Sequence, residues 1–272
     1  TMGLQPKGGA IPALPLSIIE PFLSYRQVLT ETQLVGVPRV LGGEKQAIGF
    51  VSGDVVFVND SLPLGSRYGI YTQGKALYDS DGKTFLGLEL ELSATGQISE
   101  TGRISRLSLL SSKQEVKAGQ FVMPISDATM LPAYFMPHAA PAGLSGNIIA
   151  SEAKTTEIGP LQVAMVNLGK DNGAAPGQVY AVHQPRKEIL EDSSDDVKPY
   201  RELLGRNAYD RVMARLSDGR TVILPAVYEG EIMLFKTFDK VSLGLIVNGR
   251  RPMRVADEIM APSPMIFGSE RD

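Results

Sequence analysis

Short runs of β-branched and aliphatic residues, separated by glycine-rich breaks, dominate this chain from about residue 34 onward. Residues 37–41, 47–51 and 55–58 are runs of strand length. Residues 67–72 alternate polar and apolar side chains around two tyrosines, as a half-buried strand does. The pattern predicts an all-β first half.

The clearest alternation covers residues 86–92, where leucine occupies every second position. A period of two places Leu86, Leu88, Leu90 and Leu92 on one face of a strand. Glu89 and Glu91 fall on the other face, which we interpret as solvated. The preceding residues 79–83, Asp-Ser-Asp-Gly-Lys, predict a tight turn, because aspartate and glycine supply the side-chain bonds and positive φ that hairpins need.

The chain carries two similar blocks, which predict an internal duplication at roughly residues 53–124 and 162–262. Chance similarity is the alternative, since any two β-meanders share alternating apolar residues and turn glycines. The matched positions are Val58-Asn59, Gly65 and Tyr68-Gly69-Ile70-Tyr71 against Val166-Asn167, Gly173 and Tyr180-Ala181-Val182-His183, and residues 118–124 against residues 256–262.

These patterns predict a mainly β protein made of two small barrel-like or sandwich-like modules with a little helix. Two modest domains suit a chain of 272 residues. An acidic insertion in the second module, at residues 187–216, contains apolar residues near helical spacing. The predicted organisation is an extended leader at 1–35, a first β module at 36–124, a proline-rich linker at 125–145, a second β module at 146–262 with an acidic and helical insertion at 187–216, and a tail at 263–272.

Composition narrows the function classes. A net charge of -3 gives no electrostatic footprint for nucleic acid. The absence of cysteine excludes disulfides and cysteine-ligated zinc. The sequence contains no apolar run of the roughly 18–20 residues that a membrane helix needs, so we expect no membrane insertion.

Candidate catalytic groups are weak, and we predict neither an enzyme nor a cofactor or metal site. The two histidines, His138 and His183, lack the spacing of metal ligands. Asp79 and Asp81 resemble part of a calcium loop, but a plain turn explains them better. Glu89 and Glu91 could form the carboxylate pair of a glycosidase, yet the chain has no tryptophan to build a sugar platform.

Four residues are candidate partner contacts. Phe235 and Phe238 would lie on opposite faces of a regular strand, which exposes one of them unless a bulge or a neighbouring domain covers it. Arg250 and Arg251 could contact an acidic partner, or simply solubilise a turn.

Several blocks resemble the C-terminal region of TsaP-type LysM-domain proteins, which associate with the secretin of type IV pilus systems. Residues 166–180 are also similar to the C-terminal module of the flagellar protein FlgT. The resemblance to the TsaP type spans essentially the whole chain, and its blocks are residues 11–24, 68–71 with 86–89, 114–119, and 230–245, the last being the most specific.

The resemblance implies a periplasmic, non-enzymatic scaffold that ties the outer-membrane secretin to the cell wall. In that family a signal peptide and a peptidoglycan-binding LysM domain precede this region, so the resemblance implies a fragment without the wall anchor. Self-association is a further expectation. The alternative from another class is a glycan-binding or peptidoglycan-modifying module. The insertion at 187–216 is larger than the family pattern leads us to expect.

Overall fold

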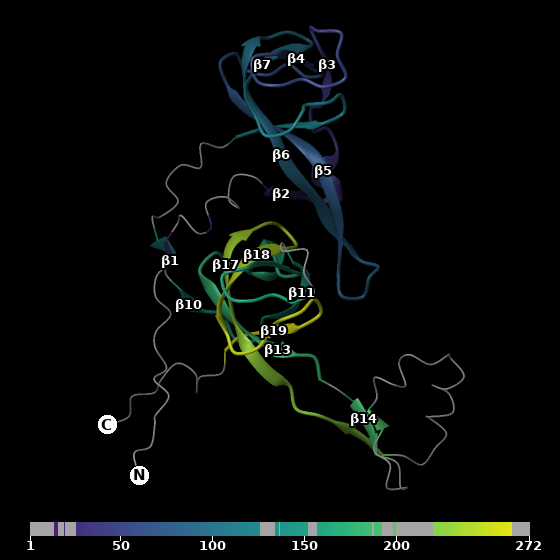
Figure 1. The fold of residues 1–272 in the computed structure, drawn as a ribbon, viewed down its shortest axis with the longest axis vertical. Helices are drawn as coiled ribbons and strands as arrows, with labels where there is room; N and C mark the ends of the chain where they lie inside the picture. Colours follow the sequence, from purple (N-terminus) through teal and green to yellow (C-terminus); the bar gives the residue numbers. More distant parts are fainter. Residues whose placement is uncertain are drawn as a thin grey trace, which may run out of the picture.

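The computed structural model describes residues 14–15, 19, 26–125, 134–135, 137–151, 157–186, 188–191, 198–199 and 220–262. Its two seven-stranded sheets form two β modules that follow one another along the long axis of the molecule (Figure 1). The fold is mainly β, as the alternation predicts. No helix among these residues is long and apolar enough to cross a membrane.

The first module contains one short helix and seven strands. Its sheet has the order β3-β4-β7-β6-β5-β8, and β2 pairs with β6 beside it. The elements are β2 (Arg26–Leu29), α2 (Glu31–Leu34), β3 (Val40–Gly43), β4 (Val55–Val58), β5 (Arg67–Tyr78), β6 (Phe85–Glu100), β7 (Ser105–Ser112) and β8 (Phe121–Pro124).

The second module is a closed barrel. Its six strands run in the order β13-β17-β18-β12-β11-β19, and β19 pairs back with β13. The elements are β10 (His138–Ala139), β11 (Ser145–Ser151), β12 (Val163–Val166), the 3-10 turn η1 (Lys170–Asn172), β13 (Gln178–Gln184), β17 (Val227–Thr237), β18 (Ser242–Gly249) and β19 (Glu258–Met260).

Two smaller sheets accompany the modules. Strand β1 (Leu14–Pro15) pairs with β9 (Tyr134–Phe135), which joins the N-terminal segment to the segment between the modules. Strands β14 (Glu188–Glu191), β15 (Lys198–Pro199) and β16 (Arg220–Ile223) form a three-stranded sheet that projects away from the second module (Figure 1). The predicted helical positions at 203–216 and the tail at 263–272 lie outside the described residues.

The two modules share one topology. In chain order, β3, β4, β5, β6, β7 and β8 correspond to β11, β12, β13, β17, β18 and β19, and both sets follow the same spatial order. In each, three hairpin-connected strands are followed by a strand that returns beside the first of them, which is a Greek key. The β-bulges also coincide, for example between Ile98 and Glu100 and between Leu234 and Lys236.

Side-chain bonds repeat with the strands. The Asn59 Oδ1 atom accepts from the Arg39 amide at 2.6 Å, and the Asn167 Oδ1 atom accepts from the Asn147 amide at the same distance. The hydroxyl groups of two serines, Ser105 and Ser242, donate to the carbonyl oxygens of Asp60 and Leu168 at 2.7 and 2.6 Å. The repeated Val-Asn pair therefore ties the second strand of each module to its first.

The structure corrects the repeat in detail. Gly65 corresponds to Gly177, because their amides donate to the equivalent carbonyls of Ile98 and Leu234; the turn η1 shifts the match away from Gly173. The last block is out of register by one residue, since Val122 pairs with Ile70 as Ile259 pairs with Val182.

One further correction concerns turn geometry and the start of the repeat. Gly119 and Ala256 hold the same left-handed turn position, with φ of 87° and 80°, although the sequence pairs Ala118 with Ala256. The repeat also begins earlier than predicted, because β3 and β11 belong to it. Such a turn normally favours glycine, so Ala256 hides it from sequence comparison.

The first module closes less completely than the second. A single bridge, Arg39 to Phe121, joins its first strand to its last, whereas β11 and β19 pair over three residues. Pro38 stands where the second module has Gly146, and proline has no amide proton to extend the ladder.

Two predicted boundaries are wrong. Residues 26–29, assigned to the leader, are strand β2 of the first sheet, and Val28 is buried. Within the predicted linker, His138 and Ala139 form a parallel strand with β13, and Ala140 enters the core of the second module. These segments pair with distant strands, so their local sequence gives little sign of it.

Candidate functional site: the interface between the modules

The interface is made where the β5–β6 hairpin and β2 meet the outer surface of the second barrel (Figure 1). We call the outward surface of β12, β17 and β18 the docking face. It is apolar and buried: Val163, Met165, Met233, Phe235, Val241, Leu243 and Leu245 are all less than one-tenth exposed. The residues that cover it, Ile19, Val28, Leu77 and Leu86, come from the N-terminal part of the chain and from the first module.

Alternation along β17 explains how one strand serves two cores. Ile232 and Leu234 point into the barrel, whereas Met233 and Phe235 belong to the outer cluster. Burial of these outward side chains is favourable by about 1.5–3 kcal/mol each relative to solvent exposure. The docking face is therefore a second hydrophobic core, shared between the modules.

Phe235 and Phe238 are not available to an external partner here. Phe235 is 1% exposed and Phe238 is 9% exposed, and both lie in the cluster that the first module covers. A register shift between Leu234 and Lys236 breaks the regular alternation of β17. The bulge and the neighbouring module thus remove the exposure that a regular, isolated strand would impose.

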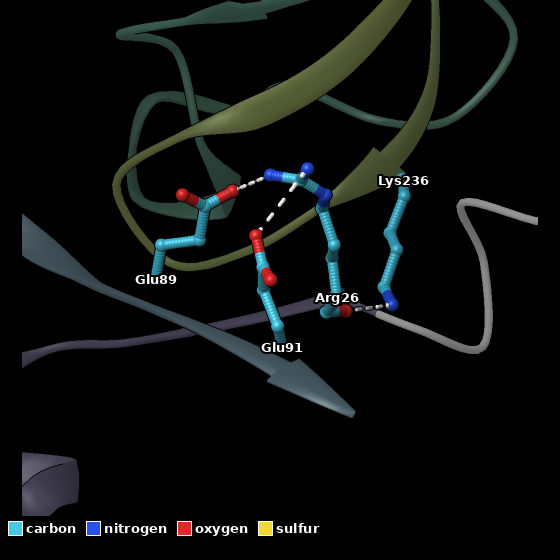
Figure 2. Close-up of polar contacts among 4 residues, drawn as sticks. All are labelled: Arg26, Glu89, Glu91 and Lys236. Carbon is cyan, nitrogen blue, oxygen red and sulfur yellow. Dashed lines mark hydrogen bonds and ion pairs between the residues drawn. The ribbon is translucent and has the colours of Figure 1, made fainter. Parts of the chain in front are cut away.

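The polar centre of the interface lies on the glutamate face of β6, which we expected to be solvated. The Arg26 guanidinium forms an ion pair with the buried Glu89 carboxylate and lies 3.6 Å from Glu91 (Figure 2). The pairing of β2 with β6 sets Arg26 opposite Glu91 and next to Glu89. The prediction for Glu89 is wrong because β2 and the second module cover that face.

The leucine face of β6 differs from the prediction at one position. Leu88, Leu90 and Leu92 share a cluster with Leu29 and Leu34, from β2 and α2. Leu86 instead joins the docking-face cluster. It is the extra residue of a bulge, since Leu77 pairs with Gly87 and Tyr78 with Phe85.

Lys236 connects the docking face to the backbone of β2. Its Nζ atom donates to the Arg26 carbonyl oxygen at 2.5 Å (Figure 2). Desolvation by burial lowers the pKa of Lys236 to about 8. Its ammonium also lies 5.2 Å from the centre of the Phe238 ring.

Two more hydrogen bonds cross the interface at its edges. The Gln33 Nε2 atom donates to the Asp239 Oδ2 atom at 2.8 Å, and the Asn167 Nδ2 atom donates to the Asp79 Oδ1 atom at 2.5 Å.

Asp79 belongs to the predicted turn, which the structure confirms: the Asp81 carboxylate accepts three hydrogen bonds from Lys83 and Thr84. The turn explanation of this motif therefore accounts for its geometry.

The interface holds a cavity of about 90 Å³. This volume is below the roughly 300–1,000 Å³ that is usual for small-molecule sites. The Glu89 carboxylate is engaged by Arg26, and this ion pair within the first module lies against residues of the second. Among the residues that the structure describes, no group of three or more histidine or acidic side chains is placed to hold a metal ion.

The remaining sequence candidates lie elsewhere. Arg250 and Arg251 are exposed between β18 and β19, and their amides donate to the Glu229 carbonyl oxygen. The Arg250 guanidinium stacks over Tyr228 at 5.3 Å, and Tyr228 meets His183 edge to face. His138 is exposed on β10. Arg250 and Arg251 stay candidate partner contacts.

Sequence reasoning missed Glu229, a buried carboxyl beside these arginines. It is 5% exposed, and its Oε2 atom has no hydrogen-bond partner. Desolvation, a side-chain hydrogen bond with Asp257 and the charge of Asp257 raise the pKa of Glu229 to about 7, against smaller opposing effects from Arg254 and Arg251. Alternation along β17 could have shown that Glu229 lies on the same side as Glu231, but not that it is buried.

Glu229 predicts a pH-dependent stability. In the folded state the Glu229 carboxyl keeps its proton up to about pH 7, whereas in the unfolded chain it loses it near pH 4.5. The protonated carboxyl therefore stabilises the folded state fully below pH 4.5, and this stabilisation is lost as the pH rises through about 7. We expect the free energy of unfolding to fall by about 2 kcal/mol between pH 5 and 8, with solvent at the barrel edge limiting the effect. Urea unfolding of the wild type and Glu229→Gln would measure it.

The amide of Glu229→Gln cannot titrate, so the variant should show a flatter profile over the same range. The informative quantity is the difference between the two profiles, because other groups titrate in both proteins. Parallel profiles would mean that Glu229 is ionised throughout this range.

A scan against protein-family models finds no match for this chain, and no curated protein matches its sequence.

Proposed function

We propose that this chain is a non-enzymatic periplasmic scaffold from a LysM-type protein that associates with the outer-membrane secretin of a type IV pilus system. A LysM domain N-terminal to this sequence would link the assembly to peptidoglycan. The sequence resemblance over residues 230–245 suggests the family. Much of that stretch forms β17 and β18, the strands that carry most of the docking face.

The observation that carries the scaffold proposal is the locked pair of equivalent modules. A buried apolar face, the Lys236–Arg26 hydrogen bond and hydrogen bonds at both edges hold the modules together. Such preorganisation suits docking, since a rigid surface loses less conformational entropy on binding than a flexible one. The exposed faces of the two modules would thereby keep a fixed spacing.

A pull-down tests this proposal. The purified chain serves as bait for detergent-solubilised cell envelope, with mass spectrometry as the readout and purified secretin in a second, direct binding assay. Enrichment and direct binding of secretin are expected. Retention on peptidoglycan sacculi without secretin binding would overturn the scaffold proposal in favour of a glycan-binding module, and capture of neither would overturn both.

Arg250 and Arg251 allow a sharper version of the same assay. Because both are exposed, the double variant Arg250→Glu, Arg251→Glu should fold normally and weaken secretin binding by about tenfold if they contact an acidic surface. The matched control is Lys113→Glu, Lys117→Glu, which makes the same charge change on an exposed part of the first module. Equal effects of the two double variants would indicate net charge alone.

A further inference from the structure

The first module has the same face that the second module uses for docking. Strand pairing sets the correspondence: Phe57 pairs with Arg106 in the first module as Met165 pairs with Leu243 in the second. By the same registers, Leu41 corresponds to Ile149 and Glu100 to Lys236. This equivalent face is built on β3, β4, β6 and β7.

The equivalent face is open. It holds a groove of about 580 Å³, lined by Leu41, Gly42, Gly43, Phe57, Glu100, Ile104 and Arg106. Leu41 and Ile104 are each 50% exposed. Exposed apolar side chains gathered in a groove and rimmed by charge are typical of a binding surface.

The second module also has the matching donor. In the first module, β5 and β6 run beyond their barrel and bring Leu77 and Leu86 to the docking face. In the second module, β13 and β17 are continued by β14 and β16, which pair with each other and project away from the barrel (Figure 1). When residues are counted along the chain from the matched positions of β5 with β13 and of β6 with β17, Leu77 corresponds to Ile189 and Leu86 to Val222 on this extension.

We propose that the groove of the first module binds the β14–β16 extension of a second copy of this chain. The contact would repeat between copies the arrangement that joins the two modules within one chain. Such an interface is heterologous, so copies would add head to tail into an open chain or a ring. The inference takes up the self-association expected from the sequence, goes beyond the proposed function and does not depend on secretin binding.

One exposed charge supports this occupant. Arg106 in the groove forms ion pairs with Glu44 and Glu100, whereas Arg103 lies beside the groove, next to Leu41 and Ile104, and is exposed. The sequence of the extension is acidic, with glutamate at both ends of β14 and further acidic residues after it. Opposite charges at the rim favour encounter and fix the orientation of the two copies.

Sedimentation velocity over a concentration series tests the contact. The wild type should show concentration-dependent association, and Ile104→Arg should weaken it at least tenfold by placing a charge in the groove. Ile48→Arg is the matched control, because Ile48 is an exposed isoleucine of the same module that does not line the groove. A wild type that stays monomeric up to about 100 μM, or equal association of wild type and Ile104→Arg, would overturn the proposal.

A mixing experiment separates this arrangement from a symmetric dimer. Ile104→Arg keeps the donor extension, and Ile189→Arg keeps the groove, so neither should self-associate. Mixed together, they should form a 1:1 complex. Failure to form it, with both variants folded by circular dichroism, would exclude the head-to-tail contact, whereas the secretin pull-down would judge the proposed function separately.

Discussion

Glu89→Ala is expected to lower the free energy of unfolding by about 3–5 kcal/mol, the usual loss when one partner of a buried ion pair is removed. The Glu89 side chain is 6% exposed, and the Arg26 side chain beside it is 22% exposed. Without the carboxylate, the guanidinium stays largely desolvated next to the second module. Urea unfolding followed by far-ultraviolet circular dichroism would measure the loss, since the chain has no tryptophan.

Glu91→Gln is the matched control for this variant. Glu91 faces the same guanidinium, but its side chain is 43% exposed and lies 3.6 Å away. Exposed pairs contribute about 0–1 kcal/mol, so its loss should stay below about 1 kcal/mol. A comparable loss in both variants would show that burial does not set the contribution of the Arg26–Glu89 pair.

The double variant Arg26→Met, Glu89→Met completes the test. Replacing both charges by apolar side chains should recover most of the lost stability, because no unpaired charge remains in the interface. The coupling energy from this cycle would measure the interaction between the two residues. A double variant as unstable as Glu89→Ala would instead point to packing of the Glu89 side chain.

Phe235→Ala should cost about 3–5 kcal/mol, as truncation of a fully buried phenylalanine does. The ring packs between the second barrel and the residues of the first module that cover the docking face. We therefore expect protection against amide hydrogen exchange to fall in β2 and at the end of the β5–β6 hairpin, as well as in β17. Exchange mass spectrometry would locate the effect.

Val227→Ala is the control on the same strand. Val227 is 37% exposed, so its truncation should change the unfolding free energy by no more than about 0.5 kcal/mol. If Phe235→Ala left the stability unchanged but weakened binding to a partner, Phe235 would be a contact residue after all. Its burial in this structure argues for the structural role.

The polar contacts of the interface could not be predicted from the sequence, because they join residues that are far apart along the chain. Arg26 and Glu89 are 63 positions apart, and nothing local marks them as partners. The same holds for Gln33 and Asp239, which are 206 positions apart. The exposure expected for Glu89 followed correctly from the alternation of one strand, but alternation cannot show what covers the polar face.

Local sequence was enough to predict the strand-rich class, the hairpin turn at residues 79–83 and the matched tyrosines Tyr68 and Tyr180, because alternation and turn chemistry are local properties. The register of the repeat, the place of β2 and the burial of Glu89, Phe235 and Phe238 became visible in the folded molecule. Those outcomes depend on which surfaces meet when two modules pack. Contacts between distant segments are set by the shape of the whole fold.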